Sequence, residues 1–257
     1  MVVIWRWDGT VEQVRNLAYP NGYPYRPDLI NLVNIAGKNA LELTAVSRVG
    51  NGSKQPGFSI YIPTIATEFY RRYTVYFPAD YSLTKTTGGF GWLDFHELLS
   101  YCCYDDAFAA GLLEDRFHAT GILQALQHWA VDELYLQTYY MSAPTGNDAV
   151  VANANARLRR QTWHTIQSYV KIHETAGQLI HWLDGVEVFN IAGICTDPRR
   201  VLGVRTSTTG FGHYTDTDLY FPQKIYMGEF TVQTEPFVTR NITVDSSPQG
   251  IPFTIRR

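Results

Sequence analysis

Residues 162–189 read TWHTIQSYVKIHETAGQLIHWLDGVEVF and contain two runs in which apolar and polar residues alternate. The runs HTIQSYVKI (164–172) and QLIHWLDGVEVF (178–189) are rich in β-branched and aromatic residues, which favour strands. Asp184-Gly185 stands between two apolar runs, and such a pair is a strong signal for a two-residue hairpin turn. The stretch therefore predicts antiparallel strands joined by tight turns.

The same pattern recurs along most of the chain, in short runs bounded by Gly, Pro, Asn or Asp. Helical periodicity is confined to two short stretches, 10–18 and 107–116. Strands without intervening helices favour antiparallel sheets closed as a sandwich or barrel. No break in composition divides the chain, so we expect a single domain over residues 1–257. The further predicted strands are 39–46, 57–63, 71–78, 90–98, 114–120, 132–140, 200–207 and 224–233.

One segment departs from the strand pattern. Residues 142–160, SAPTGNDAVVANANARLRR, combine turn residues and small residues with a basic end that carries Arg157, Arg159 and Arg160. We expect a long loop here. Long loops in compact domains are often functional, and a solvated excursion is the alternative.

Composition limits the classes of function. Of the 257 residues, 45% are hydrophobic and 18% are charged, which fits a sizeable core and argues against global disorder. The net charge of −3 gives no reason to expect nucleic acid or an anionic membrane as partner. The chain has 17 Tyr, 13 Phe and 6 Trp, and aromatic residues are typical both of strands and of sugar-binding surfaces.

No run of about 18 apolar residues occurs, so no transmembrane helix is expected. The opening residues MVVIWRWDGT have neither a basic segment nor a long apolar segment, as a signal peptide would. We expect an extracellular protein whose signal peptide is absent from this sequence.

The order of the predicted strands resembles that of the concanavalin-like jelly-roll superfamily, which includes polysaccharide lyases, glucanases and lectin-like modules. The motif W-x-x-I-x-x-x-V-K (163–171), followed by G-x-x-x-x-W-L-D-G-V (177–186), is similar to back-sheet strands of alginate-lyase-like and heparin-lyase-like sandwiches. The run GKNALEL (37–43) and the closing run IYMGEFTV (225–232) also fit. The resemblance spans about residues 35–235. It implies an all-β jelly-roll sandwich of two antiparallel sheets, with a concave groove in which a polysaccharide lies.

The run GGFGWLDFHELLSY would then be one strand of the groove sheet. Strand alternation divides it into two rows. Leu93 and Phe95 suit the core between the sheets, and the other row would face the groove. The residues of that second row are Trp92, Asp94 and His96.

Glucanases of this superfamily carry Glu-x-Asp-x-x-Glu or Glu-x-Asp-x-Glu on such a strand. Here Trp92 stands where the nucleophilic carboxylate would be, and Asp94 follows. A retaining glycosidase needs two carboxyl groups about 5–5.5 Å apart. The hydrolytic mechanism that is common on this fold is therefore disfavoured.

A lyase needs other groups. Breaking a uronate chain by β-elimination requires a cation or hydrogen-bond donors on the carboxylate, a base for the α proton and an acid for the leaving oxygen. Alternation in 114–120 puts Arg116, His118 and Thr120 on one face, and alternation in 132–140 puts Tyr135, Gln137 and Tyr139 on one face. The expected roles are base for His118 or His96, acid for Tyr139 or Tyr135, carboxylate neutralisation for Arg116 and Gln137, and sugar contact for Trp92 and Asp94.

Each of these residue types also has an ordinary structural interpretation. Tyrosines on strands often pack, a lone histidine is often a hydrogen-bonded structural group, and Arg116 could pair with Glu114 or Asp115. We read the three histidines of the predicted back sheet as structural. These are His164, His173 and His181.

The leading hypothesis is a polysaccharide lyase that cleaves an acidic glycan by β-elimination. The alternatives are a non-catalytic carbohydrate-binding or virion or cell-surface module on the same fold, and a glycoside hydrolase that uses Asp94 with a distant carboxylate. No cofactor is required for the elimination. A structural Ca²⁺ could bind Asp216 and Asp218, whose spacing can supply oxygen ligands.

Overall fold

The structure of the chain is a computed structural model. The residues that it describes are 2–18, 22–46, 56–63, 66–88, 91–99, 119–128, 133–142, 147–173, 175–194, 196, 207–215, 220 and 222–237.

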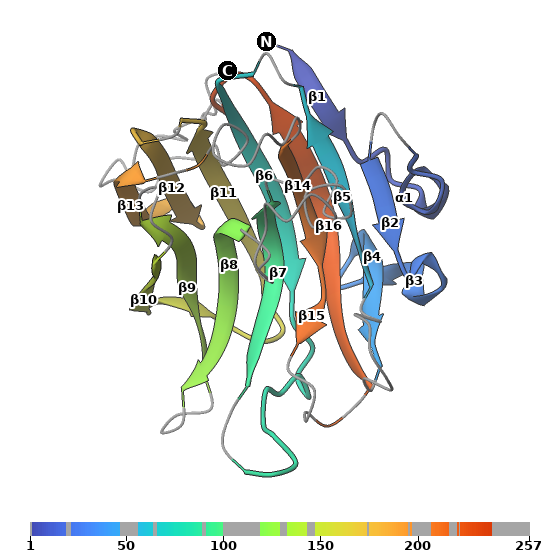
Figure 1. Cartoon of the computed structure of the whole chain (residues 1–257). Helices are drawn as coiled ribbons and strands as arrows, with labels where there is room; N and C mark the ends of the chain where they lie inside the picture. The colour runs from blue at the N-terminus through green and yellow to red at the C-terminus, as the bar shows by residue number, and fades with distance from the viewer. Residues whose placement is uncertain are drawn as a thin grey trace, which may run out of the picture.

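Two antiparallel sheets of eight strands each make up the fold (Figure 1). In the first, sheet A, neighbouring strands follow one another in the order β13-β12-β11-β6-β16-β4-β3, and β1 also pairs with β16. The strands of sheet A are β13 (Val186–Ile194), β12 (Gly177–Leu183), β11 (Trp163–Lys171), β6 (Glu68–Tyr76), β16 (Gln223–Gln233), β4 (Lys38–Ala45), β3 (Ile30–Ile35) and β1 (Val3–Arg6).

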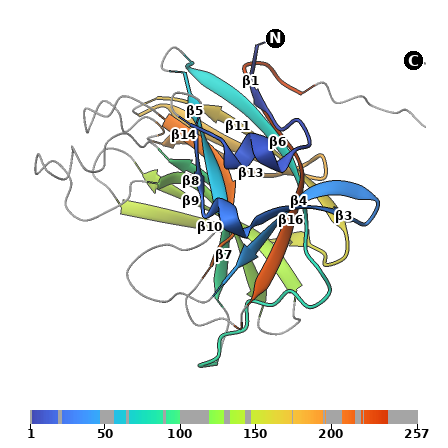
Figure 2. The same ribbon diagram turned by 90° about the vertical axis from the view of Figure 1, so that its right-hand side faces the viewer.

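Sheet B has the order β10-β9-β8-β7-β14-β5-β2, with β15 also paired to β7. In the view of Figure 2, β5, β14, β8, β9 and β10 lie on one side, and β6, β16, β4 and β3 lie on the other. The strands of sheet B are β10 (Asn147–Leu158), β9 (Glu133–Ser142), β8 (Ala119–His128), β7 (Trp92–Leu99), β14 (Ser207–Gly212), β5 (Gly57–Ile62), β2 (Gly22–Tyr25) and β15 (Tyr214–Thr215). The expected two-sheet antiparallel sandwich is confirmed.

Helical structure among the described residues is brief: α1 (Val11–Arg15) and the 3₁₀ turn η1 (Pro27–Leu29). Thr10 caps α1, because its side-chain oxygen accepts a hydrogen bond from the Gln13 backbone N–H at 3.3 Å. In the described part of the chain, no helix is long and apolar enough to cross a membrane.

The hairpin predicted at Asp184-Gly185 joins β12 to β13. Both residues have positive φ, 52° at Asp184 and 85° at Gly185. A two-residue turn with positive φ at both positions is the type I′ turn, which Asp-Gly favours because Asp tolerates the left-handed region and Gly has no Cβ. This prediction from the sequence is confirmed.

Alternation along β11 and β12 determines which side chains reach the core. On β11, Ile166 and Val170 are fully buried, and Leu179 on β12 is buried beside them. Their neighbours along each strand are half-buried or exposed. The period-two pattern of the sequence is therefore the pattern of burial.

Aromatic side chains join the two sheets across the interior. Phe58 of β5 meets Phe230 of β16 edge-to-face at 5.1 Å between ring centroids, and Phe211 of β14 meets Tyr73 of β6 at 5.2 Å. All four rings are buried. Burying a ring of this size contributes about 1.5–3 kcal/mol, so these contacts are a main source of inter-sheet stability.

One prediction about sheet B was wrong. Residues 147–158 form the strand β10 and not part of a loop, since they pair with β9 from Asn147 opposite Ser142 to Leu158 opposite Leu134. Of the strand expected at 114–120, residues 114–118 lie outside the described residues, and residues 119 and 120 begin β8, which extends to His128. Runs rich in Ala, Leu, Gln and Asn weaken the β-propensity of β8 and β10, and pairing with neighbouring strands overrides it.

Candidate functional site

Buried and half-buried side chains alternate along the strand β9. Leu134, Leu136 and Thr138 have no exposed surface, whereas Tyr135 and Gln137 between them are half-buried. The alternation predicted for this strand is therefore confirmed over Leu134–Thr138. Tyr135 and Gln137 lie on the face of sheet B that is turned away from the core.

Strand pairing places Gln137 in line with residues on β8 and β7. Gln137 on β9 lies opposite Gln124 on β8, and Gln124 lies opposite Asp94 on β7. Residues directly opposite one another in neighbouring strands have Cβ atoms about 4.5–5.5 Å apart. The backbone therefore aligns the predicted positions Asp94 and Gln137 in one transverse row, with Gln124 between them.

A second row runs parallel to the first, two residues away along each strand. Tyr135 on β9 lies opposite Leu126 on β8, which lies opposite Trp92 on β7. On its other side Tyr135 lies opposite Arg157 of β10. Trp92, which we expect to stack on a sugar, and Tyr135, a candidate acid, therefore share a row with Arg157. We did not assign this arginine to the site from the sequence.

The register of β7 is interrupted after Asp94. Position 96 lies opposite Leu123, although regular pairing from Asp94 and Gln124 would have placed it opposite residue 122. Leu123 in turn lies opposite Thr138, whose side chain is buried. The shift is reversed by Leu98, which lies opposite Thr120, as regular pairing from Asp94 and Gln124 requires. The pairing of β7 with β8 is therefore irregular at position 96, and the expectation that His96 shares a face with Trp92 and Asp94 stays a prediction.

The structure describes only some of the other predicted site residues. Tyr139 lies on β9 opposite Ile122. Arg116 and His118 lie outside the described residues, as do Asp216 and Asp218 of the expected calcium site. Within the described ranges there is no group of three or more His, Cys, Asp or Glu side chains that could hold a metal ion. The catalytic roles of all these residues stay predictions.

A buried polar network lies between the two sheets. Arg71 of β6 is fully buried, and its guanidinium donates hydrogen bonds to the hydroxyl oxygens of Thr209 on β14, at 2.5 Å, and of Ser168 on β11, at 3.1 Å. The Ser168 hydroxyl also lies 2.8 Å from Nδ1 of His181 on β12. Burial, together with the neighbouring Arg71 charge, lowers the pKa of His181 to about 3. His181 is therefore neutral near pH 7, and its contacts agree with a structural role.

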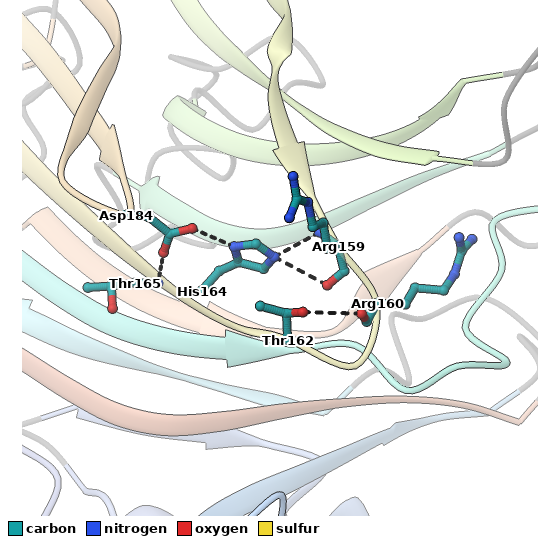
Figure 3. Close-up of polar contacts among 6 residues, drawn as sticks. All are labelled: Arg159, Arg160, Thr162, His164, Thr165 and Asp184. Atoms are coloured by element: carbon teal, nitrogen blue, oxygen red, sulfur yellow. Dashed lines mark hydrogen bonds and ion pairs between the residues drawn. The ribbon is translucent and has the colours of Figure 1, made fainter.

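His164 and Asp184 form a second polar pair at one end of sheet A (Figure 3). The imidazole of His164 is buried, and its Nδ1 lies 2.7 Å from a carboxylate oxygen of Asp184. Its Nε2 accepts a hydrogen bond of 2.7 Å from the backbone N–H of Arg159. Because Nε2 accepts, Nδ1 carries the proton and donates it to Asp184.

Asp184 also ties its hairpin to β11. Its second carboxylate oxygen accepts the backbone N–H of Thr165 at 2.7 Å. Partial burial acts to raise the pKa of Asp184, but the hydrogen bonds from His164 and from Thr165 outweigh it and hold the pKa below its usual value. Both nitrogens of His164 have partners, so this pair is a structural element and not a free acid–base pair.

Comparison with known proteins bears on the fold. The chain is similar to the structure of alginate lyase Aly36B in complex with an alginate trisaccharide, with a TM-score of 0.60 and 13% sequence identity over 91% of this chain and 94% of that one. A second structure of Aly36B gives a TM-score of 0.59 and 14% identity, over 87% of this chain and 90% of that one. Alginate lyase vAL-1 from Chlorella virus gives 0.51 and 11%, over 79% and 88%.

No family model matches the chain, and no curated protein matches it in sequence. The likeness to solved structures therefore shows a shared fold. The chain is a β-sandwich of the jelly-roll class, and it has the architecture of alginate lyases, as the strand order in the sequence indicates.

Proposed function

We propose that the protein is a polysaccharide lyase that cleaves a uronate-containing glycan by β-elimination on the outer face of sheet B. The observation that carries the proposal is the likeness to alginate lyases along nearly the whole of both chains. The polar face of β9, with Tyr135 and Gln137 half-buried and in register with Trp92 and Asp94, supports it.

In the proposed reaction, a base removes the proton α to the uronate carboxylate. A carbon–carbon double bond forms, the glycosidic carbon–oxygen bond breaks, and an acid protonates the leaving oxygen. His118 or His96 is the proposed base, and Tyr139 or Tyr135 is the proposed acid. Removing the α proton puts negative charge on the carboxylate, so hydrogen-bond donors there stabilise the transition state.

Gln137 is the proposed donor on β9, and Arg116 is its proposed cationic partner. A Gln amide offers two N–H donors, which suit a carboxylate. Gln137 and Tyr135 are two residues apart on one face of the strand, or about 7 Å. That spacing allows one side chain to contact the carboxylate while the other reaches the neighbouring glycosidic oxygen.

The position of Glu133 argues against its being the distant carboxylate of the hydrolase alternative. Glu133 lies four residues from Gln137 on β9, about 13 Å along the strand from the row of Asp94. Glycosidases hold their two carboxyl groups about 5–9.5 Å apart. Glu133 is also engaged in an ion pair with Arg157 at 2.8 Å. Asp94 and Glu133 are therefore too far apart to form a hydrolytic pair.

The experiment is to incubate the protein with alginate, glucuronan, heparin-type and pectic chains and to record two signals. A lyase produces the ultraviolet absorbance of an unsaturated uronate. New reducing ends without that absorbance would identify a hydrolase. Binding without either signal would identify the carbohydrate-binding module, and either result would overturn the proposal.

The acid is tested with matched tyrosine variants. Tyr135→Phe or Tyr139→Phe should reduce kcat by about 10²–10⁴, because one of the two hydroxyls supplies the proton. Tyr169→Phe is the control, since Tyr169 is also half-buried on a strand but lies in sheet A, where its hydroxyl donates to Glu68 at 2.8 Å. Full activity in both test variants would contradict the assignment of the acid.

A further inference from the structure

The end of β10 carries a hollow of about 240 Å³, lined by four charged residues and one leucine. Three of the charged residues are arginines and one is a glutamate, although the whole chain has a net charge of −3. The hollow is therefore a local concentration of positive charge on an acidic protein. Its lining residues are Glu133, Arg157, Leu158, Arg159 and Arg160.

Arg159, like Arg157, is exposed. Within the described part of the chain its guanidinium makes no hydrogen bond or ion pair. Its backbone is fixed, because the N–H donates to Nε2 of the buried His164, which is held in turn by Asp184. In Figure 3 the guanidinium of Arg159 points away from this imidazole. A fixed backbone thus presents a cation to the hollow.

The two other arginines are oriented by their neighbours. Arg157 pairs with Glu133 at 2.8 Å, with both side chains about half exposed. Nε of Arg160 donates to the backbone carbonyl of Tyr81 at 2.6 Å. These contacts orient the two guanidinium groups beside the hollow.

The hollow continues the candidate face of sheet B. Arg157 lies opposite Tyr135 in the register of β9 and β10, and Glu133 is two residues beyond Tyr135 on the same face of β9. The distance from Gln137 to Glu133 is about 13 Å along the strand, which is longer than one sugar ring. If a glycan chain lies along β9, the sugar unit that occupies the hollow is therefore a different unit from the one that reacts.

We propose that this hollow is an outlying subsite that binds the carboxylate of a uronate unit, with Arg159 as its principal ligand. This inference rests on the proposed function for the position of the reacting unit over Tyr135 and Gln137. Guanidinium and carboxylate groups pair in a planar, bidentate way, which makes the site selective for acidic over neutral sugars.

The test compares alginate trimers and octamers by titration calorimetry with the full chain. Arg159→Gln should weaken octamer binding about tenfold and leave trimer binding unchanged, because only the longer chain extends from the reacting position to the hollow. Arg159→Lys, which keeps the charge but loses the bidentate geometry, should lie between. Arg6→Gln is the matched control, since it removes an exposed arginine of β1. A carboxyl-reduced octamer should show no difference between wild type and Arg159→Gln.

The outcomes separate this inference from the proposed function. Cleavage by the wild type with equal octamer affinity in Arg159→Gln would overturn the subsite and keep the lyase. Length-dependent loss of binding without any cleavage would keep the subsite and overturn the lyase. A loss that is equal for trimer and octamer would also overturn the subsite.

His164 acts in this proposal as a positioning residue. His164→Asn should weaken octamer binding in the same direction as Arg159→Gln, with little additional loss in the double variant. A purely structural effect would weaken trimer and octamer alike, and that result would remove His164 from the proposal.

Discussion

At the scale of single residues, Arg71 is the least expected feature of the interior. Its guanidinium is buried between the sheets and bonded to two hydroxyl groups, and among the described residues it has no carboxylate partner. Its Nε has no hydrogen-bond partner there either. Burial lowers the pKa of Arg71 to about 9, which reflects the cost of removing the cation from water.

Replacing Arg71 with an apolar residue of similar length should stabilise the fold. In Arg71→Met the desolvation cost disappears, and Ser168 keeps its contact with His181. We expect an increase in the free energy of unfolding of about 1 kcal/mol or more, measured as a shift in the urea midpoint. Arg71→Ala is the comparison and should destabilise the fold by about 2–5 kcal/mol because it leaves a cavity. A large loss in Arg71→Met would show that the hydrogen bonds outweigh the cost of burial.

Gln137 permits a prediction about activity. If it donates to the uronate carboxylate as charge develops, Gln137→Ala should lower kcat by about 10²–10³ with a smaller effect on KM. Gln167→Ala is the matched control, because Gln167 is also half-buried but lies on β11 of sheet A. Rates on a cleaved glycan supply the measurement, and an unchanged kcat would exclude Gln137 from the reaction.

At the scale of elements, the β12–β13 hairpin is more than a connection. Asp184 adopts the left-handed conformation that the turn requires, and its carboxylate bonds the backbone of β11 and the imidazole of His164. One residue therefore fixes a turn, a strand and the segment that carries Arg159. The sequence signal for the turn contained no information about this second function of the side chain.

Asp184→Ala should lower the free energy of unfolding by about 2–4 kcal/mol. The alanine is strained at positive φ, and the buried imidazole of His164 and the backbone N–H of Thr165 lose their acceptor. Asp184→Asn keeps one acceptor and tolerates positive φ, so its loss should be at most half as large. Thermal or urea unfolding measures both. Equal losses would mean that the charge of Asp184, and not its hydrogen-bond geometry, is what the hairpin needs.

At the scale of the whole molecule, neutral histidines buried in the sandwich make its stability depend on pH. His213 is fully buried, its Nδ1 lies 2.9 Å from the carbonyl oxygen of Leu43, and its Nε2 lies 3.3 Å from the Tyr81 hydroxyl. Burial outweighs the backbone hydrogen bond and lowers the pKa of His213 to about 4. His181, with its pKa at about 3, acts in the same direction.

Stability should therefore fall in acid. Between pH about 6.5 and about 4, these histidines are protonated in the unfolded chain but stay neutral in the folded chain. The free energy of unfolding therefore decreases as pH falls through that window. His213 alone accounts for about 3 kcal/mol. Urea midpoints at a series of pH values should show a shallower decrease for His213→Asn than for wild type. Parallel curves would contradict the assignment.

The sequence predicts the architecture because alternation and turn chemistry are local properties. The residue types alone predict two features: the alternating burial along β11 and β12, and the type I′ turn at Asp184-Gly185. The sequence does not predict β10, because its Ala and Asn residues have weak strand propensity. They form a strand because they pair with β9 beside them. The roles of Arg71 and Arg157 could not be predicted either, since each depends on contacts across strands or sheets.

The candidate site is predictable to the same degree. Tyr135 and Gln137 follow from the alternation of one strand, and the structure places them on the expected face. Gln124 was missed because its strand was not recognised beyond position 120. The pairing of His96 is irregular, and no residue type in the run predicts that irregularity.

The irregular pairing of β7 has a consequence for how relatives of this chain are to be aligned. The register with β8 shifts between Asp94 and His96 and shifts back between His96 and Leu98, so Asp94 and Leu98 are in the same register. A homologue with regular pairing would therefore align with this chain at both positions without a gap. At position 96 the alignment would match residues that have different partners on the neighbouring strand, and a conservation score for that column would average two unrelated selective pressures.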